Sequence, residues 1–347
     1  MTIKEFHFET GVYRPPSEGG SDSLLLRFTR NCPWNHCTFC TMYKKQKFQL
    51  RSITEIKGDI NAMARLSREL TAASDFLGQG GEITRDAAIS LMDEFPELNS
   101  HQGFPMLVHW LMAGGQTAFI QDGNSMIMKT RDLVAALNHL RTIFPSINRV
   151  TTYARARTLV QKSAADLGAI RKAGLDRLHL GLETGDDGLL KKIKKGVTSE
   201  GQIQGGKKAM AAGFQVSEYW MPGLGGRELT CAHATNTARV LNAINPHYIR
   251  SRPFRAIAGT PLHAQIQAGE VSILSSREQL LELKQMITAL EVTSRVCFDH
   301  AGNHWRNSQG QILLTHDYEG YKFPEQKAPL LDLIDQGLER TLPGSLS

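Results

Sequence analysis

The chain has 347 residues, of which 41% are hydrophobic and 21% charged, and its formal net charge is +6 at pH 7. This composition is typical of globular proteins and excludes collagen-like, low-complexity and largely disordered chains. Because the sequence contains no apolar run near the roughly 18 residues of a membrane span, and no signal peptide at its N-terminus, we expect a soluble, cytoplasmic protein without a membrane partner.

The first predicted strand covers residues 23–29, which are mostly apolar. A loop with three cysteines follows it, and Ser52-Ile53-Thr54-Glu55 then has the pattern of a capping box that opens a helix. Apolar residues recur at helical spacing through residue 100. Since a single crossover needs less chain than this, we expect a helical insertion at about residues 52–113, between the first and second strands.

The remaining chain alternates strands with helices. Further strands are predicted at residues 117–121, 149–154, 177–182, 215–221 and 248–254. Helices are predicted at residues 130–143, 163–173, 187–194, 199–212 and 230–243. Six strand–helix units predict an α/β fold with a parallel sheet, and we expect a partial (β/α)6 TIM-like barrel. A flat, doubly wound sheet is the alternative.

We expect three parts along the chain: an N-terminal arm at residues 1–22, the barrel at residues 23–262, and a C-terminal α/β extension at residues 263–347 that covers the barrel. Within the extension, residues 276–290 have the apolar spacing of an amphipathic helix, and residues 324–338 are typical of a closing helix. His300 and His304 lie between them and could face a substrate or be structural histidines.

Three of the five cysteines, Cys32, Cys37 and Cys40, form a C-x4-C-x2-C pattern. Thiolates placed this close repel one another unless they share a metal, and as soft ligands they select zinc, Cu(I) or iron–sulfur clusters. A structural zinc needs a fourth ligand, and His36 adjoins Cys37 too closely to turn easily to the same point. The spacing therefore favours a [4Fe–4S] cluster with one open iron, with structural zinc as the alternative.

The densest basic run covers residues 191–195, Lys-Lys-Ile-Lys-Lys, in a predicted helix. We interpret this run as a solvated helix face rather than a nucleic-acid patch. The chain also lacks an appended basic module and an aromatic-rich nucleic-acid motif, so nucleic acid is not an expected partner.

The cysteine loop after a first strand, the six α/β units and the later strand-end motifs resemble the radical SAM superfamily over residues 23–262. The usual spacing in that superfamily, C-x3-C-x2-C, is one residue shorter between the first two cysteines. The resemblance implies that Cys32, Cys37 and Cys40 hold three irons of a [4Fe–4S] cluster, while S-adenosylmethionine chelates the fourth. It also implies that one electron, from a donor such as flavodoxin or ferredoxin, splits a carbon–sulfur bond of the sulfonium.

The resemblance also assigns cofactor residues by motif position. Phe39, the aromatic residue before the last cysteine, would lie beside the adenine of S-adenosylmethionine. Glu183, in Gly-Leu-Glu-Thr-Gly, would lie near its amino group, although a strand-end Glu could instead cap the next helix. Further cofactor residues are expected at other strand ends: Asp122, Gly123, Arg155, Glu218 and Arg252. The alternatives are an ordinary Asp-Gly turn for the first two and a local salt bridge for Arg155.

We therefore expect a radical SAM enzyme that reductively cleaves S-adenosylmethionine and starts radical chemistry on an unidentified small-molecule substrate. Two alternatives stay open at this point. One is an α/β protein with a structural zinc site, and the other is a radical SAM enzyme that modifies RNA or protein.

Overall fold

The computed structural model describes residues 5–11, 22–306 and 309–339. By its internal contacts the chain divides into two units. The first unit comprises Met1–Pro33, Lys47–Tyr153 and Ala165–Arg177, and the second comprises Trp34–Gln46, Ala154–Ala164 and Leu178–Ser347. Most of the predicted N-terminal arm, residues 1–4 and 12–21, lies outside the described residues, and the limits at residues 22 and 262 stay a prediction.

Three strands of the first unit pair in parallel. They are β1 (Ser23–Leu26), β4 (Thr117–Ile120) and β5 (Arg149–Ala154), in the order β1-β4-β5. Leu26 pairs with Ile120, and Ile120 pairs with Thr152, so the three strands end level with one another. A separate antiparallel pair joins β2 (Thr29–Arg30) to β3 (Gln49–Leu50). The segments that carry Cys32 and Asp122 therefore leave the sheet at its carboxyl edge, where ligands bind in α/β folds.

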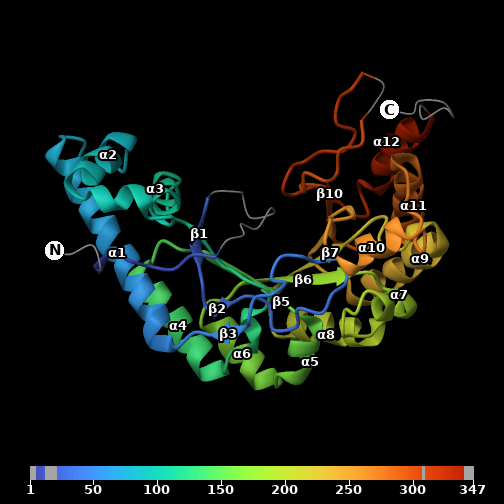
Figure 1. Cartoon of the computed structure of the whole chain (residues 1–347), viewed down its shortest axis with the longest axis horizontal. Helices are drawn as coiled ribbons and strands as arrows, with labels where there is room; N and C mark the ends of the chain where they lie inside the picture. The colour runs from blue at the N-terminus through green and yellow to red at the C-terminus, as the bar shows by residue number, and fades with distance from the viewer. Residues whose placement is uncertain (1–4, 12–21, 307–308, 340–347) are drawn as a thin grey trace. The chain divides into compact units, whose positions relative to one another are not determined.

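The predicted helical insertion is confirmed between β1 and β4. Its helices are α1 (Ile53–Phe76), α2 (Arg85–Glu94), the 3-10 turn Pro96–Ser100 and α3 (Phe104–Met112). The capping box is also present, because the N–H of Glu55 donates to Oγ of Ser52 at 3.2 Å and the N–H of Ser52 donates to Oε2 of Glu55 at 2.8 Å. Figure 1 shows α1 alongside α4 (Thr130–Ile143), and α6 (Ala164–Lys172) follows β5 after a short helix.

The second unit continues the alternation of strands and helices. Its strands are β6 (Arg177–Glu183), β7 (Gln215–Trp220), β8 (Tyr248–Ser251), β9 (Arg295–Cys297) and β10 (Tyr321–Lys322), in that order. Its helices are α5 (Ala156–Gln161), α7 (Asp187–Lys192), α8 (Ser199–Ala211), α9 (Gly226–Ile244), α10 (Pro261–Gln267), α11 (Ser276–Ala289) and α12 (Lys327–Glu339). β8 pairs in parallel with both β7 and β9, whereas β10 is antiparallel to β9. The predicted α/β class, with six βα units and mostly parallel strands, is confirmed.

The C-terminal extension contributes to the sheet and to the core of the second unit. It supplies β9 and β10, which the sequence did not predict, and the two helices that it did predict, α11 and α12. α11 packs between α9 and α12 (Figure 1). With the strands, these helices enclose an apolar cluster that includes Leu182, Trp220, Ile249 and Val296. Each buried side chain of this size stabilises the fold by about 1.5–3 kcal/mol.

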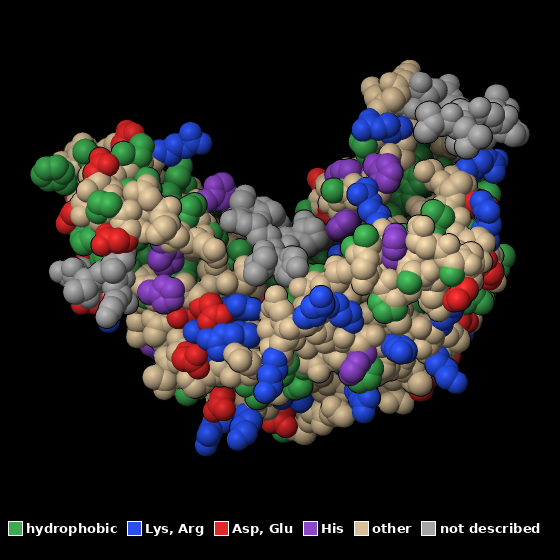
Figure 2. Space-filling model, viewed as in Figure 1, with side chains coloured by type: hydrophobic (Ala, Val, Ile, Leu, Met, Phe, Trp, Pro, Cys, Tyr) green, Lys and Arg blue, Asp and Glu red, His purple; other side chains and the backbone are tan. Residues whose placement is uncertain are grey.

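Charged side chains of both signs lie interspersed on the face of the molecule shown in Figure 2. Among the described residues, no helix is both long enough and apolar enough to span a membrane.

Candidate functional site

Cys37 and Cys40 lie on one short turn of the second unit. The N–H of Cys40 donates to the carbonyl oxygen of Cys37 at 3.4 Å. Thr38, within the turn, makes backbone hydrogen bonds on both sides. Its N–H donates to the carbonyl oxygen of Ile193, just after α7, and its own carbonyl oxygen accepts from the N–H of Leu262 in α10, both at 3.0 Å. Backbone hydrogen bonds therefore fix this part of the cysteine loop between α7 and α10.

An ion pair lies beside these cysteines. Nζ of Lys195 donates to Oε1 of Glu183 at 2.8 Å, and each side chain is only 12% exposed. Gly181 leaves room for the pair, because a Cβ there would lie 2.4 Å from Oε1 and 2.8 Å from Nζ. Burial raises the pKa of the Cys37 thiol, an effect that Lys195 opposes and that Glu183 and Cys40 increase. Burial lowers the pKa of Lys195, but the charges of Glu183 and Cys37 raise it by more. The net effect is a raised pKa, so Lys195 stays charged.

The interpretation of residues 191–195 as a solvated face is wrong for the last of them. α7 ends at Lys192, and Lys194 has a positive φ of 54°, which reverses the direction of the chain. Lys191, Lys192 and Lys194 are exposed, whereas Lys195 turns toward Glu183. Lys195 is thus a site residue that the charge pattern alone concealed.

Arg155 adds a second positive charge near Cys37. It follows β5, and its guanidinium carbon lies 4.7 Å from the centre of the Trp34 ring, in the geometry of a cation–π contact. Its Nη2 donates to the carbonyl oxygen of Lys195 at 2.6 Å, and Nε1 of Trp34 donates to that of Lys194 at 2.7 Å. Burial raises the pKa of Cys37, and the charge of Arg155 acts against it.

Glu218 is a buried carboxyl on β7. The residue is 1% exposed, and its Oε2 has no hydrogen-bond partner among the described residues. Burial raises its pKa well above the ordinary value; Lys195 opposes this effect and Glu183 adds to it. Burial favours the neutral form of this carboxyl, which can donate as well as accept a hydrogen bond.

The third cysteine of the motif, Cys32, lies in the first unit beside the predicted Asp-Gly segment. A Cβ on Gly123 would lie 3.0 Å from Cβ of Cys32 and 3.1 Å from its Sγ, so only glycine allows this approach. Asp122 has a φ of 70°, and its Oδ2 accepts from Nε of Arg27 at 2.7 Å. The segment is therefore a strained turn with a buried ion pair, packed directly on Cys32.

The other predicted cofactor residues have different surroundings. Phe39 is partly buried and packs against a small apolar cluster that includes Ile193, Met221 and Leu262. Arg252 is exposed after the end of β8. Its charge acts on the pKa of His300, and the cofactor role of Arg252 stays a prediction.

The donor chemistry at the cysteine turn fits an iron–sulfur cluster, although within the described ranges no three His, Cys, Asp or Glu side chains converge on a metal position. Cys37 and Cys40 supply two thiols from one turn, and Lys195 and Arg155 supply positive charge that favours thiolates. His36, the candidate fourth ligand of a zinc site, is exposed, and its ring packs edge-on against Trp34 at 4.9 Å. The three-cysteine ligand set stays a prediction.

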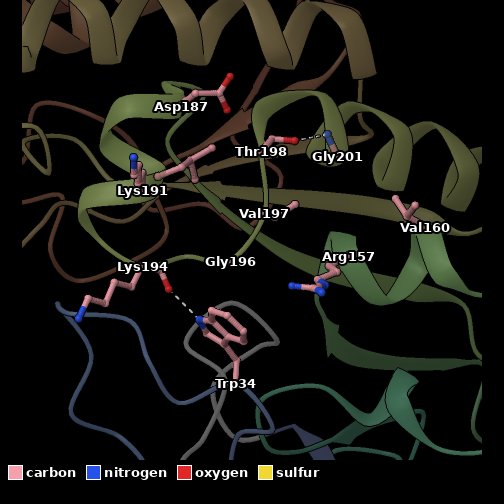
Figure 3. Close-up of a pocket in the computed structure, with 11 residues that line it drawn as sticks. Trp34, Arg157, Val160, Asp187, Lys191, Lys194, Gly196, Val197, Thr198 and Gly201 are labelled. Atoms are coloured by element: carbon pink, nitrogen blue, oxygen red, sulfur yellow. Dashed lines mark hydrogen bonds between the residues drawn. The ribbon is translucent and has the colours of Figure 1, made fainter.

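An open pocket of about 820 Å³, lined in part by Trp34, lies wholly within the second unit (Figure 3). Trp34, Arg157 and Lys194 contribute to its wall, together with Gly196 and Thr198, the N-cap of α8. Gly196 has a φ of 73°, and a Cβ there would lie 2.2 Å from Cζ2 of Trp34. The wall of the pocket is thus continuous with the chain segment that carries Lys195.

Comparison with known proteins gives structural similarity at low sequence identity. No family model and no curated protein matches the chain. Among solved structures, it is similar to archaeal Methanocaldococcus infernus Elp3 (17% identity, TM-score 0.45, covering 59% of this chain and 53% of that one) and to methylornithine synthase PylB (15%, 0.44, 78% and 65%). It is also similar to Escherichia coli HemN, coproporphyrinogen III oxidase, described as a radical SAM enzyme (14%, 0.45, 79% and 53%). The match spans between half and two thirds of the length of these three proteins.

Proposed function

We propose that this chain is a radical SAM enzyme, in which Cys32, Cys37 and Cys40 hold a [4Fe–4S] cluster and S-adenosylmethionine occupies its open iron. The observation that carries the proposal is the position of the cysteine turn beside the Lys195–Glu183 pair. Lys195 and Glu183 come from separate segments of the chain, yet both act electrostatically on the thiol of Cys37. Cations that offset burial suit a site whose thiols bind as thiolates.

The residues around the turn suit the two charged groups of the cofactor's methionine end. Arg155 and Lys195 supply positive charge for a carboxylate, with Arg155 oriented by Trp34. Glu183 uses Oε1 to accept from Lys195, and among the described residues its Oε2 accepts no hydrogen bond, which leaves it to accept from an ammonium. Glu218 is buried and its pKa is raised by burial, and its neutral form would supply a hydrogen-bond donor. When bound, the cluster and S-adenosylmethionine would supply a radical by one-electron cleavage of a carbon–sulfur bond.

The first unit has a separate part in this proposal. Gly123 lets the backbone after β4 approach Cys32, and the Arg27–Asp122 pair holds that segment in place.

The substrate would be a small molecule, and the electron would come from a carrier such as flavodoxin or ferredoxin. The alternative, a structural zinc site, predicts bound zinc instead of iron, so a measurement of metal content separates the two hypotheses.

The test is anaerobic reconstitution with iron and sulfide. We expect about four irons per chain, with broad visible absorbance, and 5′-deoxyadenosine after reduction with dithionite in the presence of S-adenosylmethionine. Cys37→Ala and Cys40→Ala should lose the iron, whereas Cys231→Ala, which changes an exposed cysteine of α9, should keep it. One zinc per chain with no iron would overturn the proposal.

A further inference from the structure

A group of basic side chains lies in the second unit, where β8 ends and the segment after β9 begins. It consists of Arg252 and Arg255 after β8, His300 and His304 after β9, and His316. We call these five residues the Arg/His patch. All but His300 are exposed, and His300 is partly buried. Figure 2 shows histidine side chains gathered beside basic ones over this part of the chain.

A buried asparagine holds the two segments of the patch together. Asn303 is 1% exposed, and its Nδ2 donates to the carbonyl oxygens of Ser251, His300 and Phe298 at 2.9, 3.0 and 3.1 Å. Its Oδ1 accepts from Oγ of Ser251 at 2.7 Å. Because the amide uses both ends inside the protein, the loop that carries His300 and His304 is fixed against the end of β8 before any ligand arrives.

The hydrogen bonds of the patch also set which ring nitrogen carries the proton in His300 and His304. Nδ1 of His300 accepts from the N–H of Gly302 at 3.0 Å, so the proton of the neutral ring is on Nε2. Nδ1 of His304 lies 2.6 Å from the carbonyl oxygen of Gly302 and must donate to it. It cannot also accept from Arg255, whose Nη2 lies 3.5 Å away, so this contact is not a hydrogen bond.

The acids near the patch pair with groups other than Arg252 and Arg255, and Oδ1 of Asp299 is buried without a hydrogen-bond partner among the described residues. Asp299 accepts from buried Arg250 at 2.7 Å, Asp317 accepts from the backbone of its own turn, and Glu319 pairs with Arg295 at 3.0 Å. Within the residues that the structure describes, neither Arg252 nor Arg255 has a carboxylate partner. Two guanidinium groups and three imidazoles thus share a surface on which, within the described ranges, no carboxylate pairs with either arginine.

The charges acting on His300 reflect this excess. Burial, the largest cause, lowers the pKa of His300 together with the charges of Arg252, Arg255 and His316, while Asp299 opposes them; the net result is a pKa of about 4. A neutral His300 keeps its Nε2–H as a donor beside the two arginines. An anion placed there would gain charge-assisted hydrogen bonds and would relieve the repulsion among the cations.

We propose that the Arg/His patch binds the anionic group, a carboxylate or a phosphate, of a small-molecule ligand. That the ligand is the substrate rests on the proposed function; the anion site itself does not. Two exposed arginines without acid partners, placed by a buried asparagine next to an imidazole N–H, give it the donors and the rigidity that an anion site needs.

The test is an NMR titration of the histidine rings of the full chain at constant ionic strength, with inorganic phosphate in one arm and acetate in the other. We expect saturable shifts of the His300 ring signals, identified by their loss in His300→Gln, and a rise of its pKa when the anion is bound. Saturation by phosphate alone indicates a phosphate ester as the ligand, and saturation by acetate as well indicates a carboxylate. Shifts that never saturate with either anion would overturn the proposal.

Variants separate this site from general charge effects. Arg252→Gln and Arg255→Gln should each weaken anion binding about tenfold, because each removes a charge-assisted hydrogen bond. Arg85→Gln, at an exposed position of α2, should bind as the unchanged protein does. Equal binding by the double variant Arg252→Gln/Arg255→Gln would also overturn the proposal. Iron content reports on the proposed function independently, so failure of one does not imply failure of the other.

Discussion

Nζ of Lys195 lies 2.8 Å from Oε1 of Glu183, and the pair exists because two residues adopt left-handed backbone conformations. Glu183 itself has a φ of 61° at the end of β6, and Lys194 has a φ of 54° just before Lys195. Such conformations are costly for residues other than glycine and are held in place by their surroundings. Here Arg155 bonds to the Lys195 carbonyl and Gly181 leaves space for both side chains.

We predict that Lys195→Met destabilises the fold by about 2–3 kcal/mol. Removing the ammonium group leaves Glu183 as an unpaired, largely buried charge. The expected cost is below the roughly 3–5 kcal/mol of breaking a fully buried pair, because both side chains are partly exposed. Urea unfolding at pH 7 measures it. Adding Glu183→Gln should recover part of the loss, and Lys192→Met, at an exposed position of the same run, should change stability by less than about 0.5 kcal/mol. Equal effects of the two lysine changes would contradict the role of the pair.

Glu218 gives a prediction with a definite pH sign. Its pKa is raised in the folded chain, so between the unfolded and folded values the folded state holds a proton that the unfolded state releases. The contribution of Glu218 to stability is therefore fully present below the pKa that this carboxyl has in the unfolded chain. It is lost as the pH rises toward the raised pKa of the folded chain, by at most about 1.4 kcal/mol per pH unit. Glu218→Gln, which stays neutral, should become more stable relative to the unchanged chain as the pH rises from 4 to 8. Urea unfolding across that range measures it, and a constant difference would disprove it.

Local signals in the sequence predicted those parts of the fold that depend on neighbouring residues. The capping box at Ser52 and Glu55 forms as expected. Gly174 and Gly213, which follow α6 and α8, both have positive φ, as the chain reversal after a helix requires. The order of strands and helices followed from apolar spacing for the same reason.

The features that the sequence did not reveal depend on distant contacts. β9 has only three residues, too few for an alternating pattern, and it is a strand because it pairs with β8. Lys195 sits in a run that is otherwise exposed, and its burial depends on Glu183 and Arg155 from other strand ends. Asn303 has no motif around it, and its role comes from contacts across to Ser251.

Gly196 supports the cysteine loop by leaving space for Trp34, and we predict that Gly196→Ala destabilises the chain by about 1–2 kcal/mol or more. A Cβ would meet the Trp34 ring at 2.2 Å, and a φ of 73° is itself unfavourable for alanine. Unfolding curves give the loss, and a shift in tryptophan fluorescence would report the displaced ring. Gly58→Ala is the matched control: it lies inside α1 with nothing within 4 Å of its Cβ, so it should stabilise the helix by about 0.5–1 kcal/mol.

Glu282 links the C-terminal extension to the turn after β7, and its two oxygens allow a graded test. Its Oε1 accepts from the N–H of Gly223 and its Oε2 from Oγ1 of Thr230, both at 2.6 Å, while the residue is 2% exposed. We predict that Glu282→Ala costs about 3 kcal/mol or more, because it leaves two buried donors without an acceptor. Glu282→Gln keeps an acceptor for Gly223 and can donate to the Thr230 hydroxyl, so it should cost about 1 kcal/mol. Urea unfolding gives both values, and hydrogen exchange at the Gly223 amide should quicken more in the alanine variant. Equal losses in the two variants would mean that α11 holds the turn by packing rather than through this carboxylate.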